Sequence, residues 1–156
     1  DQMKVLEKIL QTLNDQLADE LTAVNQYIVH SEMCANWGLD KLHDAVEKRA
    51  IEEMKHAERL IARILYLEGR PVVSMLNPMH IGAEVVEQLQ NDYVSEQGAV
   101  KSYNDAVQQA ASLGDNGTRS LFESILNDEE EHIDWLEAQL DQIRLMGIEN
   151  YLAQQV

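Results

Sequence analysis

The sequence is poor in residues that break helices and in residues that favour sheets. Its 156 residues include seven glycines and two prolines, and aromatic residues make up only 5%. Few helix breakers favour long helices, and few aromatic side chains argue against a large β-sandwich. A chain of this length can bury about two thirds of the surface that its unfolded form exposes. We therefore expect one all-α domain over residues 1–156.

Cysteine and basic residues are also scarce. The single cysteine, Cys34, excludes a disulfide within the chain, and a small buried apolar side chain in a reducing cytoplasm is the favoured interpretation. The 12 Lys and Arg against 28 Asp and Glu give a formal net charge of −16 at pH 7. No run of Lys or Arg offsets this charge, so we expect no nucleic-acid partner. The charge attracts cations, although an acidic solvated surface explains it as well.

Long apolar runs are absent as well. No stretch approaches the roughly 18 to 20 uninterrupted apolar residues that a helix needs to cross a bilayer. No charged and then apolar leader opens the sequence. We therefore expect a soluble, cytoplasmic protein with no membrane partner.

Apolar residues at helical spacing are abundant. The first stripe steps by three and four residues through Leu6, Ile9, Leu10, Leu13, Leu17, Leu21, Val24 and Ile28. Similar stripes predict five helices, which run to about 37 and over about 40–68, 83–112, 118–146 and 148–155. Thr118 is the expected N-cap of the fourth helix, after a tight turn at 114–117.

The connection over residues 69–82 is longer than the few residues that usually join antiparallel neighbours. A helix of some 28 residues is about 42 Å long, and about 14 extended residues reach about 46 Å. The segment can therefore run the full length of a bundle, so that the second and third helices are parallel. This predicts two antiparallel hairpins joined by a long crossover, rather than an up-down-up-down bundle.

Two of the predicted helices carry a glutamate three residues before a histidine. Glu53 precedes His56, and Glu129 precedes His132. Residues three apart share one face of a helix, so each pair can bind one ion together. Because glutamate is common in this chain, one such pair alone is weak evidence for a site.

The spacing of two further glutamates strengthens the case. Glu20 precedes Glu53 by 33 residues, and Glu96 precedes Glu129 by the same interval. Each half of the chain therefore supplies one helix with a glutamate and an antiparallel partner with Glu-x-x-His. These residues fall on the apolar stripes of their helices, so we expect six side chains to point inward at one level.

Four buried carboxylates require a compensating charge. Burying one unpaired carboxylate costs several kcal/mol, and the whole stability of a domain is only about 5–15 kcal/mol. Solvated glutamates such as Glu130 and Glu131 are the alternative, but the apolar stripes argue against it, and no Lys or Arg lies on them to form ion pairs. Four carboxylates and two neutral imidazoles carry −4, which two divalent ions balance. Iron or manganese suits these ligands better than a structural zinc ion.

This ligand arrangement is similar to that of ferritin-like di-iron proteins. Longer segments resemble the bacterioferritin family over nearly the whole chain: ADELTAVNQY, NWGL at 36–39, IEEMKHAERL, ILYLEG at 64–69, DEEEHIDWLEAQL at 128–140 and MGIENYL at 146–152. The resemblance implies a ferritin-like four-helix bundle with a short fifth helix. By motif, it implies that the catalytic di-iron ligands are Glu20, Glu53, His56, Glu96, Glu129 and His132, with Glu53 and Glu129 as bridges.

The resemblance also implies a function and further cofactors. It implies iron storage in a hollow shell of 24 identical subunits, with ferroxidase oxidation of Fe(II) by O2 or H2O2 at two iron ions per subunit. Met54 lies about 100° around the helix from Glu53, and the family motif EEMKHA makes it an axial ligand of haem b, shared across a two-fold interface. Packing against a neighbour is the alternative role for Met54. A small iron–sulfur ferredoxin is the implied reductant.

Some positions depart from the family pattern. Certain members carry His and Asp for an extra inner-surface iron site at positions that match Lys48 and Glu52, and a protonated lysine cannot bind a metal ion. Tyr27 matches a family tyrosine near the metals, although core packing explains it equally well.

Three other functions remain open at this point. A di-iron peroxidase resembling rubrerythrin shares Glu-x-x-His, but usually adds a Cys-x-x-Cys domain, whereas this chain has one cysteine and no room for that domain. A manganese catalase-like enzyme is a weaker match. The non-enzymatic alternative is a haem-bearing shell subunit, or a simple helical scaffold, without ferroxidase turnover.

Overall fold

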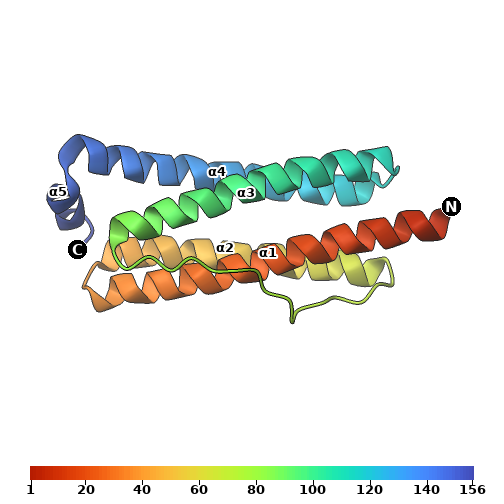
Figure 1. Cartoon of the computed structure of the whole chain (residues 1–156), viewed down its shortest axis with the longest axis horizontal. Coiled ribbons are helices and arrows are strands. Elements are labelled where there is room, and N and C mark those ends of the chain that lie inside the picture. The colour runs from red at the N-terminus through yellow and green to blue at the C-terminus, as the bar shows by residue number, and fades with distance from the viewer.

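The computed structural model describes residues 1–156 and contains helices but no strands. The helices are α1 (Gln2–Asn36), α2 (Asp40–Tyr66), α3 (Val85–Ser112), α4 (Asn116–Met146) and α5 (Ile148–Ala153). The first four lie side by side as a long bundle, and α5 lies across one end (Figure 1). The predicted all-α bundle with a short fifth helix is confirmed. None of the helices combines the length and apolarity that crossing a membrane requires.

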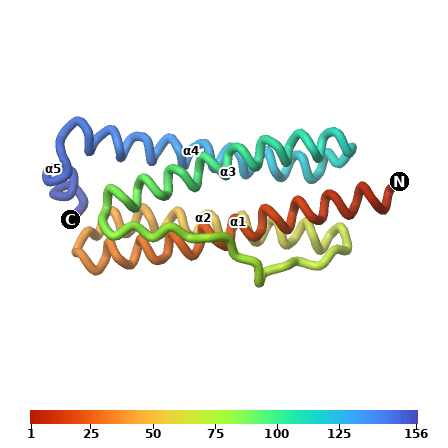
Figure 2. Tube along the Cα trace, viewed as in Figure 1, coloured from red at the N-terminus to blue at the C-terminus, as the bar shows by residue number.

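The four long helices form two antiparallel hairpins. α1 packs against α2, and α3 packs against α4. The segment between α2 and α3 runs back along the bundle, so that both of these helices start at the end that carries α5 (Figures 1 and 2). The predicted long crossover and the parallel second and third helices are therefore confirmed.

A row of polar side chains on α1 holds the crossover in place. These side chains accept hydrogen bonds of 2.8–3.0 Å from crossover N–H groups: Asn14 from Val72, Thr22 from Asn77, Gln26 from His80, and His30 from Gly82. The acceptors recur at multiples of four residues, so they lie along one face of the helix. α1 therefore supplies backbone hydrogen-bond partners for a segment that has no secondary structure of its own.

The interior contains two apolar clusters. One, around Leu13 and Phe122, fills the half of the bundle near the N-terminus. The other, around Leu42 and Tyr151, fills the half that α5 covers. Buried glutamates and histidines occupy the bundle as well, on all four long helices. The fold thus encloses a polar site within an apolar core.

Two details differ from the sequence-based expectations. Asp115, not Thr118, is the N-cap of α4, because its carboxylate accepts the Thr118 N–H at 3.0 Å. α4 therefore begins within the predicted turn. Leu6 and Ile28, predicted on the buried stripe of the first helix, are 39% and 47% exposed. The other helix ends lie within two residues of the predicted positions.

Candidate metal centre

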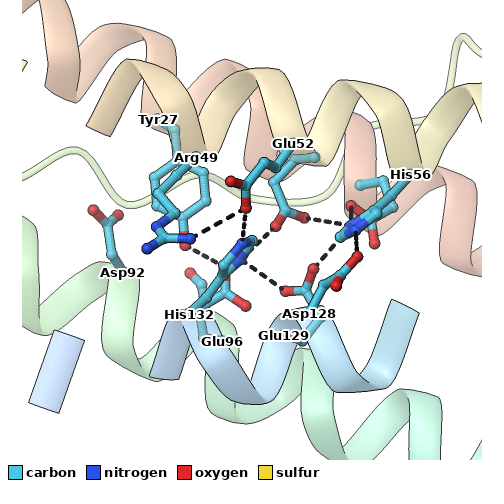
Figure 3. Close-up of polar contacts among 12 residues, drawn as sticks. Tyr27, Arg49, Glu52, His56, Asp92, Glu96, Asp128, Glu129 and His132 are labelled. Atoms are coloured by element: carbon cyan, nitrogen blue, oxygen red, sulfur yellow. Dashed lines mark hydrogen bonds and ion pairs between the residues drawn. The ribbon is translucent and has the colours of Figure 1, made fainter. Parts of the chain in front are cut away.

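The four long helices bring six ionisable side chains into the middle of the bundle (Figure 3). α1 supplies Glu20, α2 supplies Glu53 and His56, α3 supplies Glu96, and α4 supplies Glu129 and His132. Each of them is at most 3% exposed. The structure therefore brings together all six residues that the sequence singled out.

The six side chains form two overlapping groups. Glu20 and His56 belong to one group, Glu96 and His132 belong to the other, and Glu53 and Glu129 belong to both. Within each group, one ligand atom per residue lies within 4.8 Å of every other. Two shared carboxylates between two sets of terminal ligands are the geometry expected of a bridged pair of metal ions.

Seven nitrogen and oxygen atoms of this cluster are buried without a hydrogen-bond partner. They include Nδ1 of both histidines and both carboxylate oxygens of Glu129. His56 Nδ1 lies 3.0 Å from Glu129 Oε1, and His132 Nδ1 lies 2.9 Å from Glu53 Oε1, but neither pair has hydrogen-bond geometry. Buried polar atoms normally have partners, because leaving one unpaired costs about 1–3 kcal/mol. The unpaired atoms identify a place that a cation fits.

The electrostatics of the cluster point the same way. Burial and repulsion between neighbouring carboxylates raise the pKa of Glu53 and Glu96 well above the usual value. Burial opposes protonation of His56 and His132, but the close contacts of both rings with the surrounding carboxylates dominate and raise both pKa values. Burial also disfavours the charged form of Glu129, yet the close contacts with Glu96, His132 and His56 outweigh it and lower the pKa. Without metal ions, the cluster holds protons in their place.

A carboxylate from the opposite hairpin holds each histidine from behind. Asp128 Oδ2 on α4 lies 2.9 Å from His56 Nε2, and Glu52 Oε2 on α2 lies 2.5 Å from His132 Nε2 (Figure 3). Each carboxylate accepts a hydrogen bond from the Nε2–H of the ring, so each ring presents Nδ1 to the cluster. Glu52 also forms an ion pair with Arg49 at 3.1 Å. In this structure its partners are therefore Arg49 and His132. Sequence reasoning missed Asp128.

Two tyrosines bind the terminal glutamates in the same reciprocal way. Tyr27 on α1 donates to Glu96 on α3, and Tyr103 on α3 donates to Glu20 on α1 at 2.6 Å. Burial and nearby carboxylates raise the pKa of both phenols, which remain protonated donors. Sequence reasoning assigned no role at the site to Tyr103. The signal for it was present, since a shift of 76 positions carries Glu20 to Glu96 and Tyr27 to Tyr103.

A cavity of about 320 Å³ connects the cluster with the surface between α1, α3 and the crossover. Its inner lining includes Glu20, Glu96 and Glu129, and its outer lining includes Asp19 and His80. Small ions and small oxidants can therefore approach the cluster from this side of the bundle.

Met54 lies outside the cluster. Its side chain is 44% exposed on α2, and Ile51, one turn earlier, is 42% exposed. Lys48 is also at the surface. The structure therefore places the Met54 side chain at the surface, next to a second exposed apolar residue.

Comparison with known proteins gives one consistent family. The sequence model of the ferritin-like domain matches residues 10–146. A bacterioferritin of Rhodobacter capsulatus is 40% identical over 149 residues, which cover 96% of this chain and 92% of the relative. A bacterioferritin of Brucella melitensis is 42% identical over the same shares. Bacterioferritin BfrA of Mycobacterium tuberculosis is 38% identical over 146 residues, covering 94% of this chain and 92% of that protein.

Proposed function

Because this chain belongs to the ferritin-like family and, within it, to the bacterioferritins, we propose that it is an iron-storage protein with ferroxidase activity. Its substrate is Fe(II), which is oxidised to Fe(III) by O2 or H2O2 at the six-residue cluster and stored as mineral in a hollow shell. The observation that carries this proposal is the set of seven inward nitrogen and oxygen atoms that have no hydrogen-bond partner.

The donor set fits iron. Four carboxylates and two imidazoles suit iron or manganese, and no cysteine is present in the cluster for a structural zinc site. The formal −4 charge of four carboxylates balances two divalent ions. Oxygen donors favour the harder Fe(III) over Fe(II), so the protein ligands promote the oxidation.

The residues of the cluster have distinct roles in this proposal. Glu53 and Glu129 belong to both ligand groups, so they hold two Fe(II) ions close enough to reduce one oxidant together. Two Fe(II) ions supply the two electrons that convert one H2O2 and two protons into two water molecules. Tyr27 and Tyr103 fix the orientation of the two terminal glutamates.

The histidines couple iron binding to proton release. Each Nδ1 must lose its proton before it can bind a metal ion. The raised pKa of His56 and His132 means that both rings are protonated on Nδ1 as well as Nε2 in the metal-free state. Fe(II) binding therefore releases protons inside the site, where reduction of the oxidant consumes protons.

Haem b is the second cofactor that we propose, with Met54 as an axial ligand. The Met54 thioether is uncharged, accessible and flanked by exposed Ile51, which suits an apolar porphyrin face. Each chain offers one such sulfur, so an identical chain across a two-fold axis supplies the other ligand. Held by Met54 and the same residue of the second chain, haem would supply single-electron transfer, and a small iron–sulfur ferredoxin is the proposed reductant for iron release.

We further propose a shell of 24 identical subunits that works in the cytoplasm. The short α5 helix lies at one end of the bundle (Figure 1), where it can contribute to four-fold contacts. Exposed apolar residues on α1 and α2, including Leu6, Ile28 and Leu65, support contacts between chains. The single buried cysteine, Cys34, is compatible with a reducing compartment.

Aerobic Fe(II) oxidation by a matched pair of variants tests the ferroxidase. Glu129→Gln removes a shared carboxylate, whereas Glu130→Gln changes its exposed neighbour. We expect the initial rate, followed by near-ultraviolet absorbance of Fe(III), to fall by about tenfold or more in Glu129→Gln only. An unchanged rate in Glu129→Gln would favour a haem-bearing shell subunit without turnover. Rapid oxidation without iron retained in the particle would favour a rubrerythrin-like peroxidase.

A further inference from the structure

A second group of metal-ligating side chains lies at the turn between α1 and α2. It consists of Glu32 near the end of α1 and His43 and Glu47 in the first turns of α2. One ligand atom from each residue lies within 4.8 Å of the other two. His43 is ten residues before Glu53 on the same helix, which separates the two clusters by about 15 Å along the axis.

The orientation of His43 is fixed by a partner outside this group. Its Nδ1 lies 2.8 Å from the backbone carbonyl of Ser31. A carbonyl oxygen can only accept, so Nδ1 carries the proton and the lone pair of the neutral ring is at Nε2. Nε2 faces Glu47 Oε2 at 3.4 Å. Histidines that bind metal ions usually donate their other N–H to such a carbonyl or to a carboxylate.

The two glutamates of this group lack a permanent cation. No lysine or arginine nitrogen lies within 4.0 Å of Glu32 or Glu47, and the one ion-pair contact of Glu47 is with His43. The Ser31 carbonyl raises the pKa of His43 against the opposing effect of burial, and the neighbouring Glu47, Glu32 and Asp44 raise it further. The Ser31 carbonyl and the neighbouring carboxylates thus favour a cation, either a proton or a metal ion, at Nε2 of His43.

The backbone around the group is held by a short turn. Only residues 37–39 separate α1 from α2, and Gly38 adopts φ +77°, which a residue with a side chain rarely adopts. The His43 side chain is only 19% exposed. The His43 ring therefore loses little conformational freedom when it binds an ion, whereas the exposed Glu32 and Glu47 become ordered on binding.

We propose that Glu32, His43 and Glu47 bind one divalent transition-metal ion, with water completing the coordination. One imidazole nitrogen and two carboxylates suit Fe2+, Mn2+, Co2+ or Zn2+, whereas Ca2+ and Mg2+ prefer oxygen donors alone. Two carboxylates and a neutral imidazole balance the ion's charge. With three protein ligands at the surface, the ion is exchangeable. The site does not depend on the proposed ferroxidase function.

Equilibrium dialysis of the purified protein against Co2+, with metal analysis, tests this site. The variants are His43→Gln and Glu47→Gln, and the matched control is Asp44→Asn, which removes a neighbouring charge but no ligand. We expect both variants to bind one cobalt ion per chain fewer than wild type, or to bind that ion about 10- to 100-fold more weakly. Asp44→Asn should retain it.

Two results would overturn the proposal. The first is equal cobalt binding by wild type, His43→Gln and Glu47→Gln. The second is an equal loss in Asp44→Asn, which would mean that local negative charge and not ligation attracts the ion. Glu20→Ala separates the two clusters, because it disables the bundle centre and should leave the ion at His43 in place. Anomalous diffraction from Co2+-soaked crystals should place a peak next to His43 Nε2.

Discussion

Each buried carboxylate of the proposed metal centre is expected to have opposite effects on the metal-free and metal-bound states of the protein. Glu53 is 2% exposed and has no lysine or arginine partner. Without metal ions, its burial and the repulsion from its neighbours oppose the charged form and raise its pKa. With metal ions, the same charge becomes a ligand. A single residue therefore lowers the stability of the metal-free chain and contributes to that of the metal-bound one.

We expect Glu53→Gln to raise the thermal stability of the metal-free protein at pH 7. A raised carboxyl pKa gives stability that is present below the unfolded value of 4.5 and is lost as the pH rises through the folded value. Removing the charge should therefore stabilise by roughly 1–4 kcal/mol at pH 7, at about 2–4 °C per kcal/mol, and by less near pH 5. Melting curves in chelator, with Glu58→Gln as an exposed control, measure this. A lower melting temperature for Glu53→Gln at pH 7 would contradict it.

Asp128 should act on metal binding through His56. Its carboxylate fixes Nε2 of that ring, so Asp128→Ala frees the ring to rotate. Loss of such a partner typically costs about 10- to 100-fold in metal affinity. Cobalt titration of the bundle centre should show this loss for Asp128→Ala, a smaller loss for Asp128→Asn, which keeps an acceptor oxygen, and none for exposed Asp134→Ala. Wild-type affinity in Asp128→Ala would exclude the orienting role.

The sequence predicted the six central residues but only part of their surroundings. Glu20 and Glu96 could be found because they combine a repeated spacing with an apolar stripe. Asp128 precedes Glu129 by one residue and is partly exposed, so in a sequence it looks like any solvated carboxylate. Its role depends on the position of His56 across the bundle. That distance is a property of helix packing and not of either helix alone.

At the scale of elements, the crossover depends on α1 for its structure. His30 accepts the Gly82 N–H at Nε2 and donates from Nδ1 to Asp92 at 3.0 Å, with His30 and Asp92 both buried. Thr22 accepts the N–H of Asn77 in a less buried place. α1 therefore supplies Glu20 to the proposed metal centre and, through this polar row, also fixes one wall of the cavity above it.

We expect His30→Ala to loosen the crossover more than Thr22→Val does. The first change leaves the Gly82 N–H unpaired inside the protein, at about 1–3 kcal/mol. It also removes one hydrogen bond of the buried Asp92, which keeps the 2.8 Å bond from Gln26. The second removes the hydrogen bond from the Asn77 N–H, which water can replace because Asn77 is exposed. Such a bond is worth about 0.5–1.5 kcal/mol. Hydrogen exchange of the amides over 72–82 and denaturant unfolding measure both. Equal protection of the Gly82 amide in His30→Ala and wild type would contradict the anchoring role.

The helices were predicted to within two residues at most ends, because their apolar period and the glycines at the turns are local signals. The N-cap of α4 was predicted wrongly, since Asp115 and Thr118 are both good caps and only the fold decides between them. The polar row on α1 was missed for another reason. Gln26 and His30 are polar residues on a buried face, and their partners come from a segment without periodicity.

At the scale of the whole molecule, the surface of one chain exposes several large apolar side chains although the chain is strongly acidic. Large apolar side chains such as Ile51, Met54, Leu65 and Tyr66 are exposed along α2, while the chain carries a net charge of −16. In the proposed shell, burial of such residues between chains would supply the driving force for association, and the charge would limit non-specific aggregation. A shell of 24 chains of 17.8 kDa has a mass of about 430 kDa, which light scattering measures.

Met54→Leu should separate haem binding from both assembly and iron oxidation. Leucine keeps an apolar side chain of similar size but removes the thioether that we propose as the axial ligand. We expect the purified variant to lack the Soret band, with the particle mass and the rate of Fe(II) oxidation unchanged, because Met54 lies outside the metal cluster. Met75→Leu is the control, since Met75 is an exposed methionine on the crossover. Wild type should bind one haem for every two chains. A Soret band that persists in Met54→Leu would contradict the assignment, and so would one that also disappears in Met75→Leu.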